Sequence, residues 1–109
     1  MGLISIAKVA DIPAGTKIKA KAEGTELLLA NVDGTIYALA DHCPHLGGSL
    51  SGGYLEGPAI VCPNHGARFD LATGKSLGQA KILFMKMNVK DTKAYKVEIR
   101  KGEIFVDIP

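Results

Sequence analysis

Apolar and polar residues in this chain fall into short runs, and no segment of ten or more residues keeps the 3.6-residue apolar period of a helix. The clearest element is "LLLANVDGTIYALA", residues 27–40. Two apolar runs flank Asp33-Gly34 there, a pair that favours a two-residue type I′ turn. The pattern predicts a β-hairpin.

Residues 95–108, "YKVEIRKGEIFVDI", predict a second hairpin that turns at Lys101-Gly102. Val97 and Ile99 are expected on one face of its first strand, as in a half-buried antiparallel strand. The opposite face would hold Lys96, Glu98 and Arg100. Shorter strands are expected at 3–8, 16–21, 59–62, 67–71 and 82–89. These elements predict a mainly β protein, a small antiparallel sandwich or barrel.

The pattern changes in residues 41–58, "DHCPHLGGSLSGGYLEGP", which have five glycines, two prolines and no periodicity. We interpret 41–71 as a loop-built subdomain inserted into a β framework formed by 1–40 and 72–109. With 109 residues, the chain is long enough for one domain and too short for two ordinary ones.

The charge pattern argues against a nucleic-acid partner. The net charge is only +2, and residues 40–74 hold one basic side chain, Arg68, against three acidic ones. A nucleic-acid binder would be expected to place positive charge at its working surface. A membrane-spanning helix needs about 20 apolar residues in a row, and no apolar run in this chain comes near that length. No membrane partner is therefore expected. The N-terminal segment shows no targeting pattern, which predicts a cytoplasmic protein.

Candidate chemistry is concentrated in two short stretches. Cys43 and Cys62 are the only cysteines, and His45 and His65, two of three histidines, each follow a cysteine within three residues. A disulfide would leave both histidines unexplained, and a nucleophilic Cys/His pair needs only one activated thiolate. Zinc suits four such ligands, but its familiar spacings do not mix them in this way. A [2Fe–2S] cluster accounts for the mixing, because each stretch could send its cysteine to one iron and its histidine to the other.

These stretches resemble a known signature. Residues 43–48 read "CPHLGG", sixteen residues separate His45 from Cys62, and 62–70 read "CPNHGARFD" with Thr73-Gly74 following. In both halves and in spacing the chain resembles the Rieske family. The resemblance implies one [2Fe–2S] cluster and the Rieske fold, an antiparallel β framework with a cluster-binding subdomain inserted between strands.

The resemblance also implies roles for individual residues. Cys43 and Cys62 would hold the inner iron as thiolates, and His45 and His65 would hold the outer iron through Nδ1. The Nε2 edges of both histidines would then be left toward solvent or a partner. Residues expected at partner contacts are His42, Leu46, Gly47, Gly48 and Gly66.

Departures from the respiratory Rieske proteins refine the prediction. Those proteins resemble this chain at the ligands but have a second cysteine pair where Gly48 and Asn64 stand. They also place hydroxyls near the sulfurs where this chain has Ala67 and Phe69, so a low reduction potential is expected. Gln79 stands in a third loop, expected to cover the cluster, where relatives often have proline.

The functional prediction is an electron carrier and not an enzyme. Beyond the proposed ligands only His42 remains, so no second iron site can be built, and there is no dinucleotide-binding fingerprint. The chain is expected to shuttle single electrons from a reductase to a terminal oxygenase or another acceptor. The reductase is expected to contain a flavin. The alternatives are a Rieske-like small subunit of a larger reductase, such as a nitrite reductase, with a structural role, and a zinc-stabilised β module.

Overall fold

A computed structural model describes residues 2–42, 49–63, 67–78 and 91–108. The strands are β1 (Gly2–Lys8), β2 (Lys17–Ala22), β3 (Thr25–Val32), β4 (Thr35–Ala40), β5 (Tyr54–Glu56), β6 (Ala59–Val61), β7 (Arg68–Asp70), β8 (Ser76–Gly78), β9 (Ala94–Tyr95), β10 (Val97–Arg100) and β11 (Glu103–Ile108). Two 3₁₀ turns are η1 (Val9–Asp11) and η2 (Leu50–Gly52). Among the described residues, no helix is long and apolar enough to cross a bilayer.

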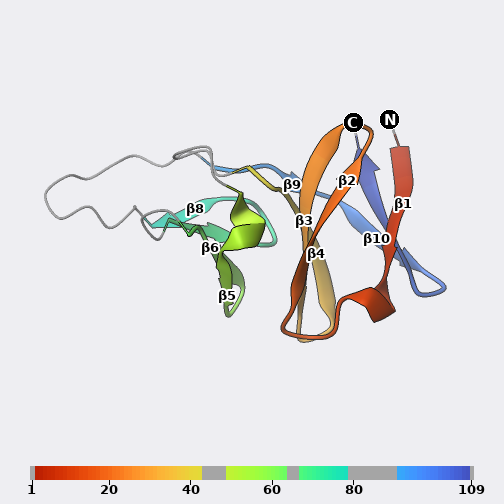
Figure 1. The fold of residues 1–109 in the computed structure, drawn as a ribbon, viewed down its shortest axis with the longest axis horizontal. Coiled ribbons are helices and arrows are strands. Elements are labelled where there is room, and N and C mark those ends of the chain that lie inside the picture. Colours follow the sequence, from red (N-terminus) through yellow and green to blue (C-terminus); the bar gives the residue numbers. More distant parts are fainter. Residues whose placement is uncertain (1, 43–48, 64–66, 79–90, 109) are drawn as a thin grey trace, which may run out of the picture.

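The strands form three sheets, with orders β1-β11-β10, β2-β3-β4-β9 and β5-β6-β7-β8. Every pairing is antiparallel. In Figure 1 the first two sheets lie together as a framework, and the third, inserted in the chain between β4 and β9, lies to one side of it. The predicted mainly β fold with an inserted unit is therefore confirmed. The inserted sheet includes β8, which lies after residue 71, the expected end of the insert.

Both predicted hairpins form around the predicted turn residues. Val32 pairs with Thr35, and Arg100 pairs with Glu103, so each turn has two residues. The residues at 33–34 and 101–102 all have positive φ, between 48° and 92°, as a type I′ turn requires. A third turn of this kind, at 23–24, joins β2 to β3 and was not anticipated.

The shorter predicted strands at 3–8, 16–21, 59–62 and 67–71 correspond to β1, β2, β6 and β7, while 82–89 lies outside the described residues. The alternation expected for the first strand of the second hairpin is only partly seen. Val97 packs against the core, but Ile99 is 46% exposed because β10 is the edge strand of its sheet. Regular alternation is found instead in β11, where Ile104, Val106 and Ile108 are buried.

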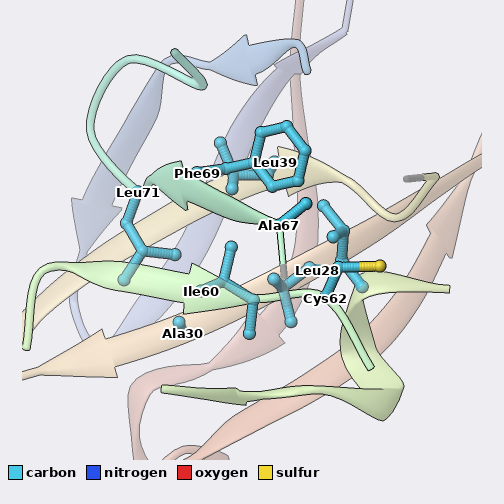
Figure 2. Packing of buried hydrophobic residues seen from close by; sticks show 9 residues of the cluster. Leu28, Ala30, Leu39, Ile60, Cys62, Ala67, Phe69 and Leu71 are labelled. Carbon is cyan, nitrogen blue, oxygen red and sulfur yellow. The ribbon is translucent and has the colours of Figure 1, made fainter. Parts of the chain in front are cut away.

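The sheet of β2, β3, β4 and β9 lies between two hydrophobic cores. One side packs against the first sheet, and we call this the framework core; its buried members are Ile12, Ala22, Leu27, Leu29, Ile36, Ala38, Ile104, Val106 and Ile108. The other side packs against the inserted sheet, and we call this the insert core; its buried members are Leu28, Ala30, Leu39, Leu50, Ile60, Cys62, Ala67, Phe69 and Leu71 (Figure 2). The apolar run in β3 is continuous because this strand is buried on both faces.

Candidate metal centre

Cys62 directly follows β6, at the start of the turn toward β7. Its backbone N–H donates to the carbonyl oxygen of Ala67 at 2.7 Å, which closes the turn at its base. The residue is only 2% exposed and belongs to the insert core. Figure 2 shows its sulfur on the side of the core away from Leu71. The other predicted residues of this turn, His65 and Gly66, lie outside the described residues.

The first predicted ligand segment, 43–48, is bounded by two residues that pair with each other. His42 and Ser49 form an isolated antiparallel bridge. The carbonyl of His42 also accepts a hydrogen bond from Thr92 Oγ1 at 3.4 Å. The bridge thus fixes both ends of the segment, and the Thr92 hydroxyl also holds the His42 end. The predicted ligand and contact residues within it, Cys43, His45, Leu46, Gly47 and Gly48, lie outside the described residues.

A buried carboxylate lies at the base of this segment. The side chain of Asp41, at 0% exposure, accepts hydrogen bonds from Ser49 Oγ at 2.5 Å, Ser51 N at 2.6 Å and Ser51 Oγ at 3.1 Å. The backbone repeats the connection, since Leu50 N donates to the Asp41 carbonyl at 3.2 Å. The sequence pattern did not indicate these residues, although an acidic residue beside the motif and a Ser-x-Ser after it were a usable signal.

Lysines of β2 connect this region to the framework. Lys19 Nζ lies 3.7 Å from Asp41 Oδ2, and Lys17 Nζ donates to the Ser51 carbonyl at 2.6 Å. Lys19 also lies 3.6 Å from Glu26, on the exposed side. Two alternating lysines of this strand thus contact the chain on both sides of the first ligand motif, Lys19 before it and Lys17 after it.

The chain after β7 and the chain before β9 are also held together. Ser76 N donates to Asp91 Oδ1 at 2.8 Å, and Thr92 N donates to the Gly74 carbonyl at 2.8 Å. Gly74 in turn donates its N–H to the Asp70 carbonyl at 2.7 Å. Gln79, in the third loop expected to cover the cluster, lies outside the described residues.

The residues that follow the first predicted ligand segment pack beside the start of the second. A β-carbon added to Gly52 or Gly53 would lie 3.8 Å or 3.2 Å from the ring of Pro63, the residue after Cys62. Leu50 and Cys62 share the insert core. A thiol held against an apolar core, beside the closing residues of a second Cys/His segment, fits the soft-ligand requirement of an iron–sulfur cluster.

Of the four predicted ligands, only Cys62 is among the described residues. Within 2–42, 49–63, 67–78 and 91–108, no three His, Cys, Asp or Glu side chains gather as a metal site. The ligand set of Cys43, His45, Cys62 and His65 therefore stays a prediction. Ala67 and Phe69, predicted to influence the potential, are both at 0% exposure in the same core as Cys62.

An open hollow of about 430 Å³ lies beside the first segment. It is lined by Asp41, His42 and Ser49 together with Lys21, Thr25 and Glu26 of the β2–β3 hairpin, among others. His42 is exposed here, as a partner contact would require, although its contact role stays a prediction. The charged lining residues Lys21 and Glu26 were not anticipated as its neighbours.

Comparison with known proteins extends this picture. The model of the Rieske [2Fe–2S] domain family matches residues 2–82. The ferredoxin component of the naphthalene 1,2-dioxygenase/salicylate 5-hydroxylase systems of a Ralstonia species is 38% identical over 103 residues, covering 94% of this chain and 92% of that protein. Among solved structures, the ferredoxin of Sphingomonas yanoikuyae B1 matches with a TM-score of 0.81 and 30% identity, over 98% of this chain and 99% of that one.

A second solved structure is the complex of reduced oxygenase and oxidized ferredoxin in carbazole 1,9a-dioxygenase. One of its chains matches with a TM-score of 0.79 and 28% identity, over 96% of this chain and 92% of that one.

The fold and the site together define an antiparallel β protein with an inserted, cysteine-bearing sheet. This chain belongs to the Rieske [2Fe–2S] domain family. Its similarity to ferredoxin components over nearly their full length makes it an electron-transfer protein of the ferredoxin type, and not a catalytic component. The predictions of family, fold and electron-transfer class are confirmed.

Proposed function

We propose that this chain carries single electrons, on one Rieske [2Fe–2S] cluster, from a flavin-containing reductase to a terminal oxygenase. The observation on which this rests most directly is the placement of Cys62, buried at the base of a closed turn beside the closing residues of the first Cys/His segment. The relatives named as ferredoxin components of dioxygenase systems support the oxygenase as acceptor. A cytoplasmic location completes the proposal, since cysteines that serve as cluster ligands suit a reducing compartment.

The proposed ligands are Cys43 and Cys62 as thiolates on one iron, with His45 and His65 on the other. When bound, such a cluster would accept and release one electron at a time. The chain's own contribution is to hold the ligands. The hydrogen bond from Cys62 N to Ala67 fixes the start of one turn, and the apolar insert core excludes water from the Cys62 side.

The partner-contact surface is proposed around the two ligand-bearing turns. His42 is exposed beside the first turn, which supports its inclusion. The other proposed members are Leu46, Gly47, Gly48 and Gly66. Small, mostly uncharged residues suit the limited and transient contacts of electron-transfer partners.

Electron paramagnetic resonance on anaerobically purified, dithionite-reduced protein tests this proposal. We expect a rhombic signal with the low average g value of mixed Cys/His ligation. A colourless protein that contains zinc or no metal would contradict the proposal. That result would favour a zinc-stabilised module or a cluster-free small subunit of a larger reductase.

A hydroxyl introduced next to Cys62 should raise the reduction potential. In Ala67→Ser the new donor enters the buried position whose carbonyl already binds Cys62 N. A hydrogen bond that is about 1 kcal/mol stronger in the more negative reduced state would raise a one-electron potential on the order of 40 mV. Protein-film voltammetry measures the shift. Ala59→Ser, also buried but on β6, is the matched control and should not change the potential.

Phe69→Tyr is expected to shift the potential in the same direction. Because Phe69 is wholly buried in the insert core, the added hydroxyl should also lower stability by about 1–3 kcal/mol if it finds no acceptor. An unchanged potential in well-folded Ala67→Ser and Phe69→Tyr variants would mean that hydroxyls at these positions do not reach the sulfurs.

A further inference from the structure

Building on the proposed function, we infer that Asp41 is a positioning residue for the cluster. Its buried carboxylate holds the two ends of segment 43–48 together, and its negative charge lowers the reduction potential. Asp41 lies two residues before the proposed ligand Cys43, and its bonding partners Ser49 and Ser51 lie just after the segment.

The positioning role follows from where the donors come from. Among the described residues, the hydrogen-bond donors to the carboxylate are Ser49 and Ser51, on the far side of the segment from Asp41 itself. The hydroxyls of Ser49 and Ser51 are also 2.8 Å apart, so the donors form one connected group. One side chain therefore closes a loop that contains two of the four proposed ligands. Closing this loop before the cluster binds reduces the entropy lost on binding.

The potential-setting role follows from burial. The Asp41 side chain is at 0% exposure, whereas the two charged groups on its outer side, Lys19 and Glu26, are 49% and 56% exposed. Lys19 is shared between the two carboxylates, and Lys17 binds the Ser51 carbonyl. Charges at the exposed positions are screened by water and salt, but a buried charge is screened much less. A buried negative charge at the entrance to the ligand-bearing segment, offset only in part by the half-exposed Lys19, disfavours the extra electron of the reduced cluster.

Two variants with the same change in net charge separate the buried position from the exposed one. Asp41→Asn keeps the shape and an acceptor for Ser51 N, and the rotatable serine hydroxyls can accept from the new amide. We expect it to retain the cluster and to have a higher potential than the wild type. Glu26→Gln removes one exposed carboxylate 3.6 Å from Lys19 and should shift the potential less. In about 1 M salt the Asp41→Asn shift should persist while the Glu26→Gln shift disappears.

Cluster retention tests the positioning role without any activity measurement. Asp41→Ala leaves three donors without their acceptor, so we expect visible absorption to be lost roughly tenfold faster under an iron chelator. Ser49→Ala removes the 2.5 Å hydrogen bond to Asp41 and the 2.8 Å contact with the Ser51 hydroxyl, but it leaves both bonds from Ser51 to the carboxylate. It is the milder variant if Asp41→Ala folds poorly, and it should also lose the cluster faster than the wild type. Glu26→Gln should match the wild-type rate.

An Asp41→Asn potential equal to the wild-type value, or a shift no larger than that of Glu26→Gln at high salt, would overturn the potential-setting role. Wild-type rates of cluster loss in both Asp41→Ala and Ser49→Ala would overturn the positioning role. Failure of the proposed function is distinguished by the wild type itself. If the unmodified protein has no Rieske signal, both the function and this inference fall, whereas a wild-type signal with unresponsive variants removes the inference alone.

Discussion

His45→Ala is expected to abolish the Rieske signal and the visible absorption, while His42→Ala leaves both unchanged. The chain has three histidines, and these two stand three residues apart on either side of Cys43. Replacing a ligand with a methyl group would leave one iron short of a donor, and loss of the cluster should follow. His42 instead lies at the base of the segment, paired with Ser49, with its side chain exposed.

Iron and sulfide content, together with the spectrum of the reduced protein, measure both outcomes. His65→Ala should behave like His45→Ala. If His42→Ala lost the cluster and His45→Ala kept it, the ligand assignment by motif position would be wrong. Loss in all three variants would point to a general destabilisation of the ligand turns, and circular dichroism would then show whether the fold survives.

The second large effect is expected at Gly74, where Gly74→Ala should destabilise the protein by about 3 kcal/mol or more. Gly74 has a φ of +78°, and a β-carbon there would lie 2.2 Å from the carbonyl oxygen of Thr92. The positive φ alone costs about 1–2 kcal/mol for a residue with a side chain. The overlap adds to this, because Thr92 N is bound to the Gly74 carbonyl and the two backbones cannot separate without breaking that bond.

Gly57→Ala is the matched control. Gly57 is in the same inserted sheet, between β5 and β6, and has a φ of +57°, but an added β-carbon there meets nothing within 4 Å. It should lose only about 1–2 kcal/mol, the part due to backbone conformation. Urea unfolding monitored by circular dichroism compares the two variants. Equal losses would show that the close approach of residue 92 to residue 74 has no energetic importance.

The parts of the fold that are predictable from sequence depend on local signals. Asp33-Gly34 and Lys101-Gly102 are suited to the positive φ that a type I′ turn requires at both positions. The apolar runs that flank each turn then indicate which strands pair. The strands β5 and β8 were not expected, because each is only three residues long and is defined by its partner strand. Ile99 was expected to face the core, but its position on an edge strand depends on the order of strands in the sheet.

In the candidate site, too, the residues with a local sequence signal were predictable and those defined by tertiary contacts were not. The Cys/His motif has a distinctive spacing that is legible in the amino-acid sequence alone, and this is enough to identify the family. Asp41 was not recognised because its importance comes from burial and from donors eight and ten residues away, Ser49 and Ser51. An aspartate at a loop entrance is usually a solvated residue, and only the three-dimensional arrangement shows that the side chain of this one is fully buried.

The separation of the two cores has a consequence for maturation of the protein. The framework core is built from β1–β4, β10 and β11 with Ile12, and none of its buried members is a proposed ligand. The insert core, in contrast, includes Cys62 and rests on the outer face of β3 and β4. A newly made chain can therefore bury most of its framework side chains before iron and sulfide arrive. The framework could then be folded when the cluster is inserted, and the inserted sheet is the part of the fold expected to depend on the cofactor for its final order.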